Sequence, residues 1–206
     1  MSDDGEKTAL YFMLFLGAVA VVQIFRNRSV AATDAGSVSF TDTNPESVAR
    51  GALEILAPMK LSPTGAAFIK QNEGLRLNRY TDNGKSAIGY GHDYTPNDPV
   101  LLQVTGSINP SSITKQQAEQ IFQIDTDARA NTLNSLLKVT VNQNQFDAMM
   151  DLLYNIGIGN FQNSTLLRMV NNGNFAGAAK QFQVWRGNQG RRSGEANLFS
   201  GGAATS

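Results

Sequence analysis

The chain contains no cysteine, and it has only one histidine and one tryptophan. Without cysteine it cannot form a disulfide, use a thiol nucleophile or bind a metal through thiolates. A single histidine also argues against a site that holds a metal through several imidazoles. We therefore expect chemistry that needs neither a metal nor a cofactor.

A surplus of charge is missing as well. The 17 acidic residues balance the 17 lysines and arginines, so the formal net charge is zero. Nothing in this balance attracts the chain toward nucleic acid, and the basic residues near the C-terminus are too sparse to follow a phosphate backbone. With 206 residues, 41% of them hydrophobic, the chain is long enough for one domain with a core plus appendages.

The longest apolar run is residues 9–25, in which Gln23 and the Tyr11 hydroxyl are the polar groups. At about 1.5 Å per residue, a helix of about 17 residues is at the lower limit for crossing a bilayer. We predict a membrane anchor here. A cleaved signal peptide and a buried soluble helix are the alternatives, although the acidic start of the chain lacks the positive segment typical of a signal peptide.

Composition then divides the chain into three parts. Residues 1–28 form the anchor, residues 29–61 a linker and residues 62–206 a compact domain. The linker is rich in small polar residues that cannot bury enough surface to offset the entropy of ordering. Its end, residues 48–59, has apolar side chains at helical spacing and predicts a short amphipathic helix.

Helix signals dominate the domain. Ser62 as N-cap and Pro63 at the first helical position predict a helix that reaches Glu73. Further helix starts are indicated at Thr114 with Gln117, at Asn142 with Gln145, near Ser164, and at Asn174 after a stop at Gly173.

One hairpin interrupts the helices. Residues 77–80 and 86–90 flank an Asp-Asn-Gly turn, a strong local signal for two antiparallel strands. The expected fold is α+β and mainly helical, with a small hairpin lobe beside a larger helical lobe. A cleft between lobes is a usual place for a ligand.

Two acids are the candidate catalytic groups. Glu73 stands nine residues before Asp82, at a helix end and at the hairpin turn. Two carboxyl groups that face one cleft can act as acid and base on a glycosidic bond. By spacing alone, two solvated acids explain the pattern as well, because Asp is common in such turns.

Several ordered segments resemble the phage lysozymes, the endolysin-type muramidases of glycoside hydrolase family 24. The first runs from Glu73-Gly-Leu-Arg-Leu through Tyr80 and Asp82 to Ile88-Gly-Tyr-Gly-His92. The others are Gln145-Phe-Asp-Ala148, Tyr154-Asn-Ile-Gly-Ile-Gly-Asn-Phe161, Ser164-Thr-Leu-Leu-Arg168, and Trp185 followed by Arg191-Arg192-x-x-Glu195-x-x-Leu198-Phe199. Together they cover about residues 62 to 200, and they imply the lysozyme-like two-lobe fold.

The resemblance implies roles for the acids and their partners. Glu73 becomes the general acid, Asp82 the carboxylate that stabilises or activates, and a threonine before the Ile-Gly pair would position water. Here Ala87 takes that place and the interval from Asp82 is one residue shorter, so Ser86 is the candidate hydroxyl if the turn rotates it inward. Without it, a slow hydrolase or a transglycosylase that closes the sugar on itself becomes credible.

Further residues carry less specific signals. One of Arg191 and Arg192 is implied to hold the Glu73 carboxylate and to shape the cleft, and Arg191 is the candidate for binding substrate, with Arg192 in support. Without the resemblance both would be a solvated pair. His92 is expected to be a bonded structural imidazole. The family positions that line the glycan cleft correspond to Tyr154, Asn155 and Ser164, of which the first two are equally consistent with the core edge. We expect Trp185 in the core rather than under a sugar.

The predicted function is cleavage of the β-1,4 bond between N-acetylmuramic acid and N-acetylglucosamine in peptidoglycan. A lytic transglycosylase and an inactive peptidoglycan-binding module of a virion are the alternatives. The partners are peptidoglycan and, through residues 9–25, a lipid bilayer, with other virion proteins possible.

Location is the least settled of these expectations. Arg26 and Arg28 beside an acidic N-terminus predict that the domain stays on the cytoplasmic side, where peptidoglycan is absent. Either this bias is too small to govern insertion, or the segment leaves the membrane, or a larger assembly presents the protein to the wall. A virion membrane or entry apparatus is favoured slightly over the host inner membrane.

Overall fold

The computed structural model describes residues 57–82 and 84–202. The predicted anchor and nearly all of the predicted linker, including its short helix, lie outside this part of the chain. Within it, none of the helices is long and apolar enough to cross a membrane. Residues from Met59 onward form one compact unit.

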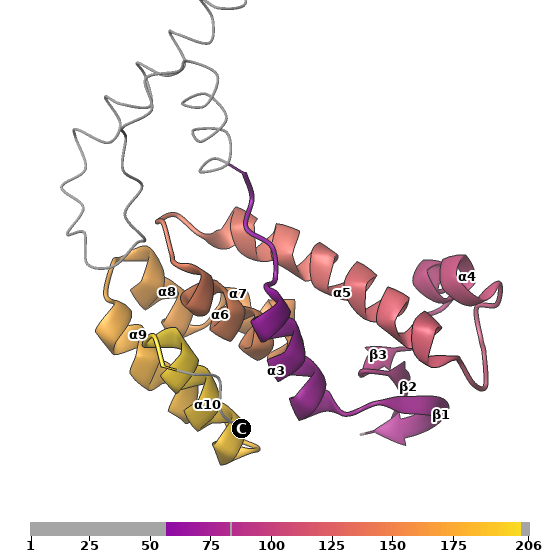
Figure 1. Ribbon diagram of the computed structural model, residues 1–206. Coiled ribbons are helices and arrows are strands. Elements are labelled where there is room, and N and C mark those ends of the chain that lie inside the picture. Colours follow the sequence, from indigo (N-terminus) through magenta and orange to yellow (C-terminus); the bar gives the residue numbers. More distant parts are fainter. Residues whose placement is uncertain (1–56, 83, 203–206) are drawn as a thin grey trace, which may run out of the picture. The chain divides into compact units, whose positions relative to one another are not determined.

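The described elements are mostly helices with one small sheet, as the sequence predicted. In chain order they are α3 (Pro63–Glu73), β1 (Arg76–Asp82), β2 (Lys85–Gly89), β3 (His92–Asp93), α4 (Pro99–Thr105), α5 (Lys115–Leu136), α6 (Gln143–Ile156), α7 (Ile158–Gln162), α8 (Thr165–Asn171), α9 (Phe175–Gln181), the 3-10 helix η1 (Phe182–Val184) and α10 (Gln189–Phe199). The long helix α5 runs from the helical lobe, α6 to α10, to the small lobe, which comprises β1 to β3 and α4 (Figure 1).

The helix starts are fixed by local hydrogen bonds. Ser62 caps α3 by accepting from the Gly65 amide, and Pro63 takes the first helical position. Complete capping boxes begin α5 and α6. Ser164 and Asn174 cap α8 and α9. These five predicted starts are confirmed.

The predicted hairpin is confirmed and gains a third strand. β1 and β2 pair antiparallel with Tyr80 opposite Ala87 and Asp82 opposite Lys85. Gly84 adopts φ of 80°, which glycine reaches without steric cost. β3 then pairs with β2 to complete the order β1-β2-β3. Neither β3 nor α4 was predicted, because both are too short to display a hydrophobic period.

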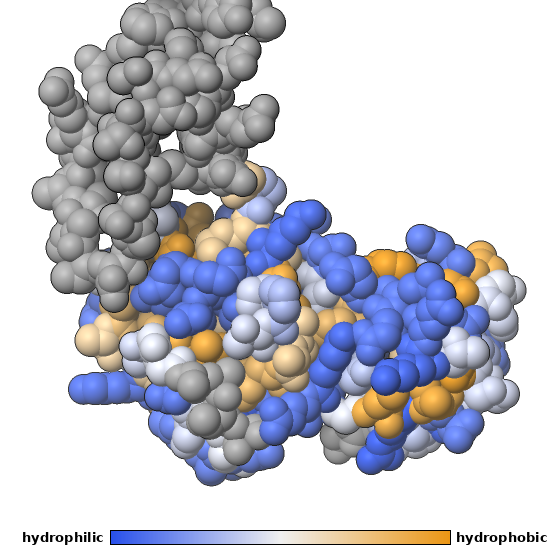
Figure 2. All heavy atoms as spheres, in the orientation of Figure 1, coloured by the Kyte–Doolittle hydropathy of each residue, from blue (hydrophilic) through white to orange (hydrophobic). Residues whose placement is uncertain are grey.

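The core is built around α6, which packs against α3, α5, α7 and α10. The predicted apolar face of this helix, Phe146, Met149, Met150 and Leu153, is fully buried. Each such side chain contributes roughly 1.5–3 kcal/mol on leaving water. On the face drawn in Figure 2, the surface is largely hydrophilic, with apolar side chains in separate spots.

A buried histidine joins the small lobe to α5. The His92 ring places Nδ1 2.8 Å from Asp125 Oδ2 and Nε2 3.3 Å from Asp98 Oδ2. Asp98 also caps α4 by accepting from the Val100 and Leu101 amides. Burial opposes a charge on the ring, but the two aspartates outweigh it and raise the pKa of His92. The expectation of a bonded structural imidazole is confirmed.

We predict that His92→Gln lowers the free energy of unfolding by about 3 kcal/mol near pH 5, because it leaves buried carboxylates without their cation. A raised pKa in the folded state means that the ring contributes fully below about pH 6.5 and loses its contribution as the pH rises through the folded value. The pKa of Asp98 is lowered because hydrogen bonds from Leu101 and Thr95, together with His92, outweigh its burial, so its contribution disappears on acidification.

Urea unfolding of wild type and variant between pH 4 and pH 9 measures this difference. The deficit of the variant should be largest between about pH 4 and pH 6.5 and should shrink at higher pH. A deficit that stays constant up to pH 9 would show that the ring is not charged in the folded protein.

Candidate active site

Glu73 is the last residue of α3, and the chain turns away directly after it. Gly74 ends the helix with φ of 70°, and its amide donates to the Lys70 carbonyl. The Glu73 side chain is 19% exposed, so its carboxyl group is largely shielded but open to solvent on one side. This is the position that a proton donor to a bound ligand requires.

Arg191 on α10 holds this carboxylate. Its Nη1 donates to Glu73 Oε1 at 2.8 Å, while Nε and Nη2 donate to the two carboxylate oxygens of Asp151 at 2.8 and 2.9 Å. Burial opposes the charge, but Asp151 and Glu73 outweigh it and raise the pKa of Arg191. The implied contact with Glu73 is confirmed. A direct role of Arg191 in binding substrate stays a prediction.

Arg192 is buried too, so the two arginines are not a solvated surface pair. Its Nη1 donates to both oxygens of Glu195 at 2.9 and 2.8 Å, and its Nη2 donates to Asn155 Oδ1. Asn155 is exposed on α6, and its Oδ1 already accepts this hydrogen bond. Glu195 and Asp151 are both 0% exposed. Sequence reasoning gave Asp151 no role, although Glu195 stood in the motif.

Tyr154 belongs to the packing behind Glu73. Its hydroxyl donates to the Tyr90 carbonyl at 2.8 Å, and its ring lies 4.5 Å from the Arg129 guanidinium. Burial is the main reason why its pKa is raised, so it remains a neutral phenol. The structure thus favours the core-edge interpretation of Tyr154 over a cleft-lining one.

Gly91 lets the sheet approach the acid closely. Its φ is 87°, and a Cβ at this position would lie 3.3 Å from Glu73 Oε2. Any side chain here would press on the carboxylate. The Ile-Gly-Tyr-Gly-His pattern was part of the resemblance, but sequence reasoning did not assign this role to its second glycine.

Asp82 ends β1 opposite Lys85 across the hairpin turn. Its side chain, like residue 83, lies outside what the structure describes. The backbone confirms the predicted position in the hairpin. That the Glu73 and Asp82 carboxyl groups face one cleft stays a prediction.

The hydroxyl of Ser86 is hydrogen-bonded to an arginine of the neighbouring strand. It accepts from Arg79 Nη2 at 3.1 Å and lines a pocket of about 550 Å³ with Arg79, Tyr94 and Asn109 among its neighbours. Ala87, the next residue in β2, is buried. Adjacent strand residues point to opposite faces, so the expectation that Ser86 turns inward finds no support in this geometry.

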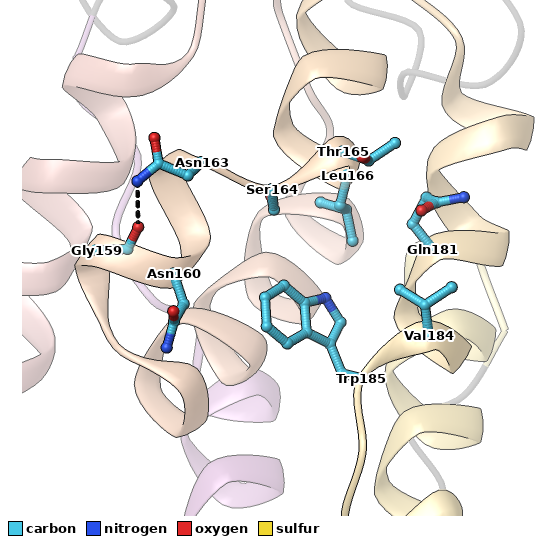
Figure 3. A pocket seen from close by; sticks show the side chains of 9 residues that line it. All are labelled: Gly159, Asn160, Asn163, Ser164, Thr165, Leu166, Gln181, Val184 and Trp185. Atoms are coloured by element: carbon cyan, nitrogen blue, oxygen red, sulfur yellow. Dashed lines mark hydrogen bonds between the residues drawn. The ribbon is translucent and has the colours of Figure 1, made fainter.

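A second pocket, of about 360 Å³, lies in the helical lobe (Figure 3). Ser164 lines it, although its hydroxyl also caps α8 by accepting from the Leu167 amide. Trp185 lies across the pocket from Asn160 in the close-up. The indole is partly buried against the core, as expected, and it also lines the pocket. Residues that sequence reasoning missed complete the lining: Gly159, Asn160, Asn163, Thr165, Leu166, Gln181 and Val184.

Comparison with known proteins agrees with this arrangement. Residues 70–196 match the family model described as phage lysozyme. The endolysin of Acyrthosiphon pisum secondary endosymbiont phage 1 is 38% identical over 62% of this chain and 80% of its own length. A solved P22 lysozyme mutant is 33% identical, with a TM-score of 0.58 over 69% of this chain and 99% of that one.

The chain spans about half the length of two endolysins that it matches, those of Bacillus phages PZA and B103. The endolysin of Bacillus phage PZA is 37% identical over 70% of this chain, and the match spans 56% of that endolysin. The chain therefore covers little more than half of this relative.

We predict that Arg191→Gln lowers the free energy of unfolding by about 3 kcal/mol, because Asp151 keeps its buried charge without a cation. Arg186→Gln is the control, since this arginine is exposed and its replacement should change stability by no more than about 0.5 kcal/mol. Thermal and urea unfolding of both variants measure the effect. If both variants lost equally little free energy of unfolding, the hydrogen bonds of the Arg191 guanidinium would contribute little to the stability of the fold.

Proposed function

Because the chain belongs to the phage lysozyme family, we propose that it is a muramidase that cleaves the β-1,4 bond between N-acetylmuramic acid and N-acetylglucosamine in peptidoglycan. The family is one of lysozyme-type glycoside hydrolases. The observation that carries the proposal is the Glu73 carboxyl group, partly exposed at the end of α3 and held by Arg191.

In the proposed reaction, Glu73 protonates the oxygen of the leaving sugar. Asp82 faces the opposite side of the sugar ring, where it directs water or stabilises the positive charge that develops at the anomeric carbon. With water between them, the two carboxyl groups would stand about 6.5–9.5 Å apart and the product would be inverted. A separation near 5 Å would mean a covalent intermediate instead.

The pocket of Ser164 and Trp185 suits an N-acetylated sugar. Its lining offers amide groups from Asn160, Asn163 and Gln181, which can donate to and accept from hydroxyl and acetamido groups. The Trp185 indole supplies an apolar surface for a sugar face. We assign this pocket to the part of the glycan on the helical-lobe side of the cut bond.

Ala87 and the engaged Ser86 hydroxyl favour a second candidate reaction. Ala87 is buried and carries no hydroxyl, and the Ser86 hydroxyl already accepts from Arg79, so a transglycosylase, which closes the sugar on itself, is the alternative enzyme. A peptidoglycan-binding module of a virion that has lost activity is the third possibility. All three share the glycan as ligand and differ in product.

We further propose that residues 9–25 anchor the protein in a bilayer, in a virion membrane or entry apparatus rather than in the host inner membrane. Length and hydropathy of this run support the anchor. The positive flank of Arg26 and Arg28 suits assembly from the cytoplasmic side. Other virion proteins would then be partners.

Glu73→Gln should reduce the clearing of a peptidoglycan suspension by at least about 100-fold, because the amide cannot donate a proton of comparable acidity. Asp127→Asn, a change at an exposed acid on α5, is the control and should clear at the wild-type rate. Unfolding curves of both variants show whether they are folded. Clearing by Glu73→Gln at the wild-type rate would refute the assignment.

Mass spectrometry of the muropeptides that the full chain releases separates the three reactions. A muramidase leaves reducing N-acetylmuramic acid ends, whereas a transglycosylase leaves anhydro ends. Sedimentation with peptidoglycan and no released product would identify a binding module. We expect reducing ends.

The anchor is tested by expressing the full chain and a variant that lacks residues 9–25, then separating membranes by flotation. The full chain should float with the membranes and the variant should remain in the soluble fraction. Full-length protein in the soluble fraction would contradict the anchor. Immunodetection of the protein in purified phage particles tests the virion location. Absence of the protein from the particles would contradict that location.

A further inference from the structure

Behind the proposed acid lies a cluster of five charged side chains, which we call the charge cluster: Glu73, Asp151, Arg191, Arg192 and Glu195. They come from α3, α6 and α10, and four of them are at most 4% exposed. Glu73 alone reaches solvent, at 19%. The contact with Arg191 links the proposed acid to buried groups that the reaction itself does not use.

The charges in this cluster do not balance. Three carboxyl groups face two guanidinium groups, so full ionisation would leave one uncompensated negative charge in a site almost closed to water. Burying an unpaired charge costs several kcal/mol, which a site avoids by taking up a proton. One of the three carboxyl groups should therefore be protonated at neutral pH.

Among the described residues, the neighbouring elements offer no further cation. On α3, Lys70 is paired with Glu119. On α5, Arg129 lies over the Tyr154 ring and Asp125 binds His92. On α9, Lys180 is exposed, and η1 carries no ionisable side chain. On α6, Asp147 is bonded to Ser62 and Gln143, and Asn155 is neutral. The surplus negative charge must be resolved inside the cluster.

Two of the buried carboxyl groups lie against the same donor. Arg191 Nε lies 2.8 Å from Asp151 Oδ2 and 3.6 Å from Glu195 Oε1, so these two carboxyl groups converge on one N–H group. Burial, followed by a hydrogen bond with Asp151 and the charge of Asp151, raises the pKa of Glu195 to about 10, despite the opposing effect of both arginines. Glu73, in contrast, keeps an ion pair with Arg191 and contact with solvent.

We propose that Asp151 and Glu195 share one proton, held mainly by Glu195, and that they act as positioning residues which set how strongly Arg191 holds Glu73. Asp151 takes two of the Arg191 donors and neutralises most of its charge, which leaves one donor for Glu73. The buried pair thereby sets how tightly the Glu73 carboxyl group is held at the site. This inference rests on the proposed function, because it concerns the acid of that reaction.

The pH dependence of peptidoglycan clearing by the full chain tests the role. In Asp151→Asn, Arg191 loses the anion that takes two of its donors, so it holds Glu73 more strongly and the alkaline limb of the pH–activity profile should move down by about one pH unit. In Glu195→Gln the amide mimics the neutral acid, with a donor for Asp151 and an acceptor for Arg192, so the limb should stay within about 0.3 unit. Asp147→Asn is the matched control, another buried aspartate on α6 outside the charge cluster, and it should not move the limb.

The proposal would be overturned if Glu195→Gln moved the alkaline limb as far as Asp151→Asn does, since Glu195 would then be ionised in the wild type. An Asp151→Asn limb at the wild-type pH would overturn it as well. Because Asp151→Asn can lose its fold, the proton is also measured directly. The chain has six glutamates, so 13C labelling of their carboxyl carbons gives a spectrum that can be assigned with Glu195→Gln.

In that spectrum, wild type at pH 7 should show one carboxyl signal at the shift of a protonated acid, and Glu195→Gln should lack it. Six ionised signals would overturn the proposal whatever the activity data give. If the wild type does not clear peptidoglycan, the proposed function fails while this spectrum still decides whether the proton is shared. The two failures can therefore be told apart.

Discussion

The Arg191 guanidinium is the interaction on which the site depends. It joins the end of α3, the middle of α6 and the start of α10 in one buried hydrogen-bond network. A lysine could not replace it, because only a planar fork presents separate donors to Glu73 and Asp151 at once. The carboxyl group of Glu73 is held at the protein surface, and its position is determined by groups that have no access to solvent.

The small lobe is attached to α5 by analogous means. His92 is placed between Asp98 and Asp125, so its ring ties the hairpin and the start of α4 to the long helix. Tyr154 and Gly91 then bring the sheet against Glu73 from the other side. Both lobes thus meet at the acid through buried polar contacts, while the apolar core around α6 supplies most of the stability.

Local signals predicted most of the fold. Ser62, Thr114 and Asn142 marked helix starts because caps act over three residues, and the Asn-Gly turn marked the hairpin for the same reason. The start of α4 was missed although Asp98-Pro99 and Gly106 carry the same cap chemistry, because its 7 residues are too few to display a helical period. For the site, Glu73 and Arg191 were predicted from the resemblance. The partners Asp151 and Glu195 were not, since spacing does not reveal which charges are buried together. The role of Ser86 stays a prediction, because its hydroxyl is bonded to Arg79.

The most direct measurement is a crystal structure of the full chain with a bound peptidoglycan fragment. The account predicts that the glycosidic oxygen lies about 3 Å from the Glu73 carboxyl group, within hydrogen-bonding distance, and that the sugar on one side of it occupies the pocket of Ser164 and Trp185. A fragment bound in the Arg79 and Tyr94 pocket, or with no sugar oxygen within reach of Glu73, would contradict the account.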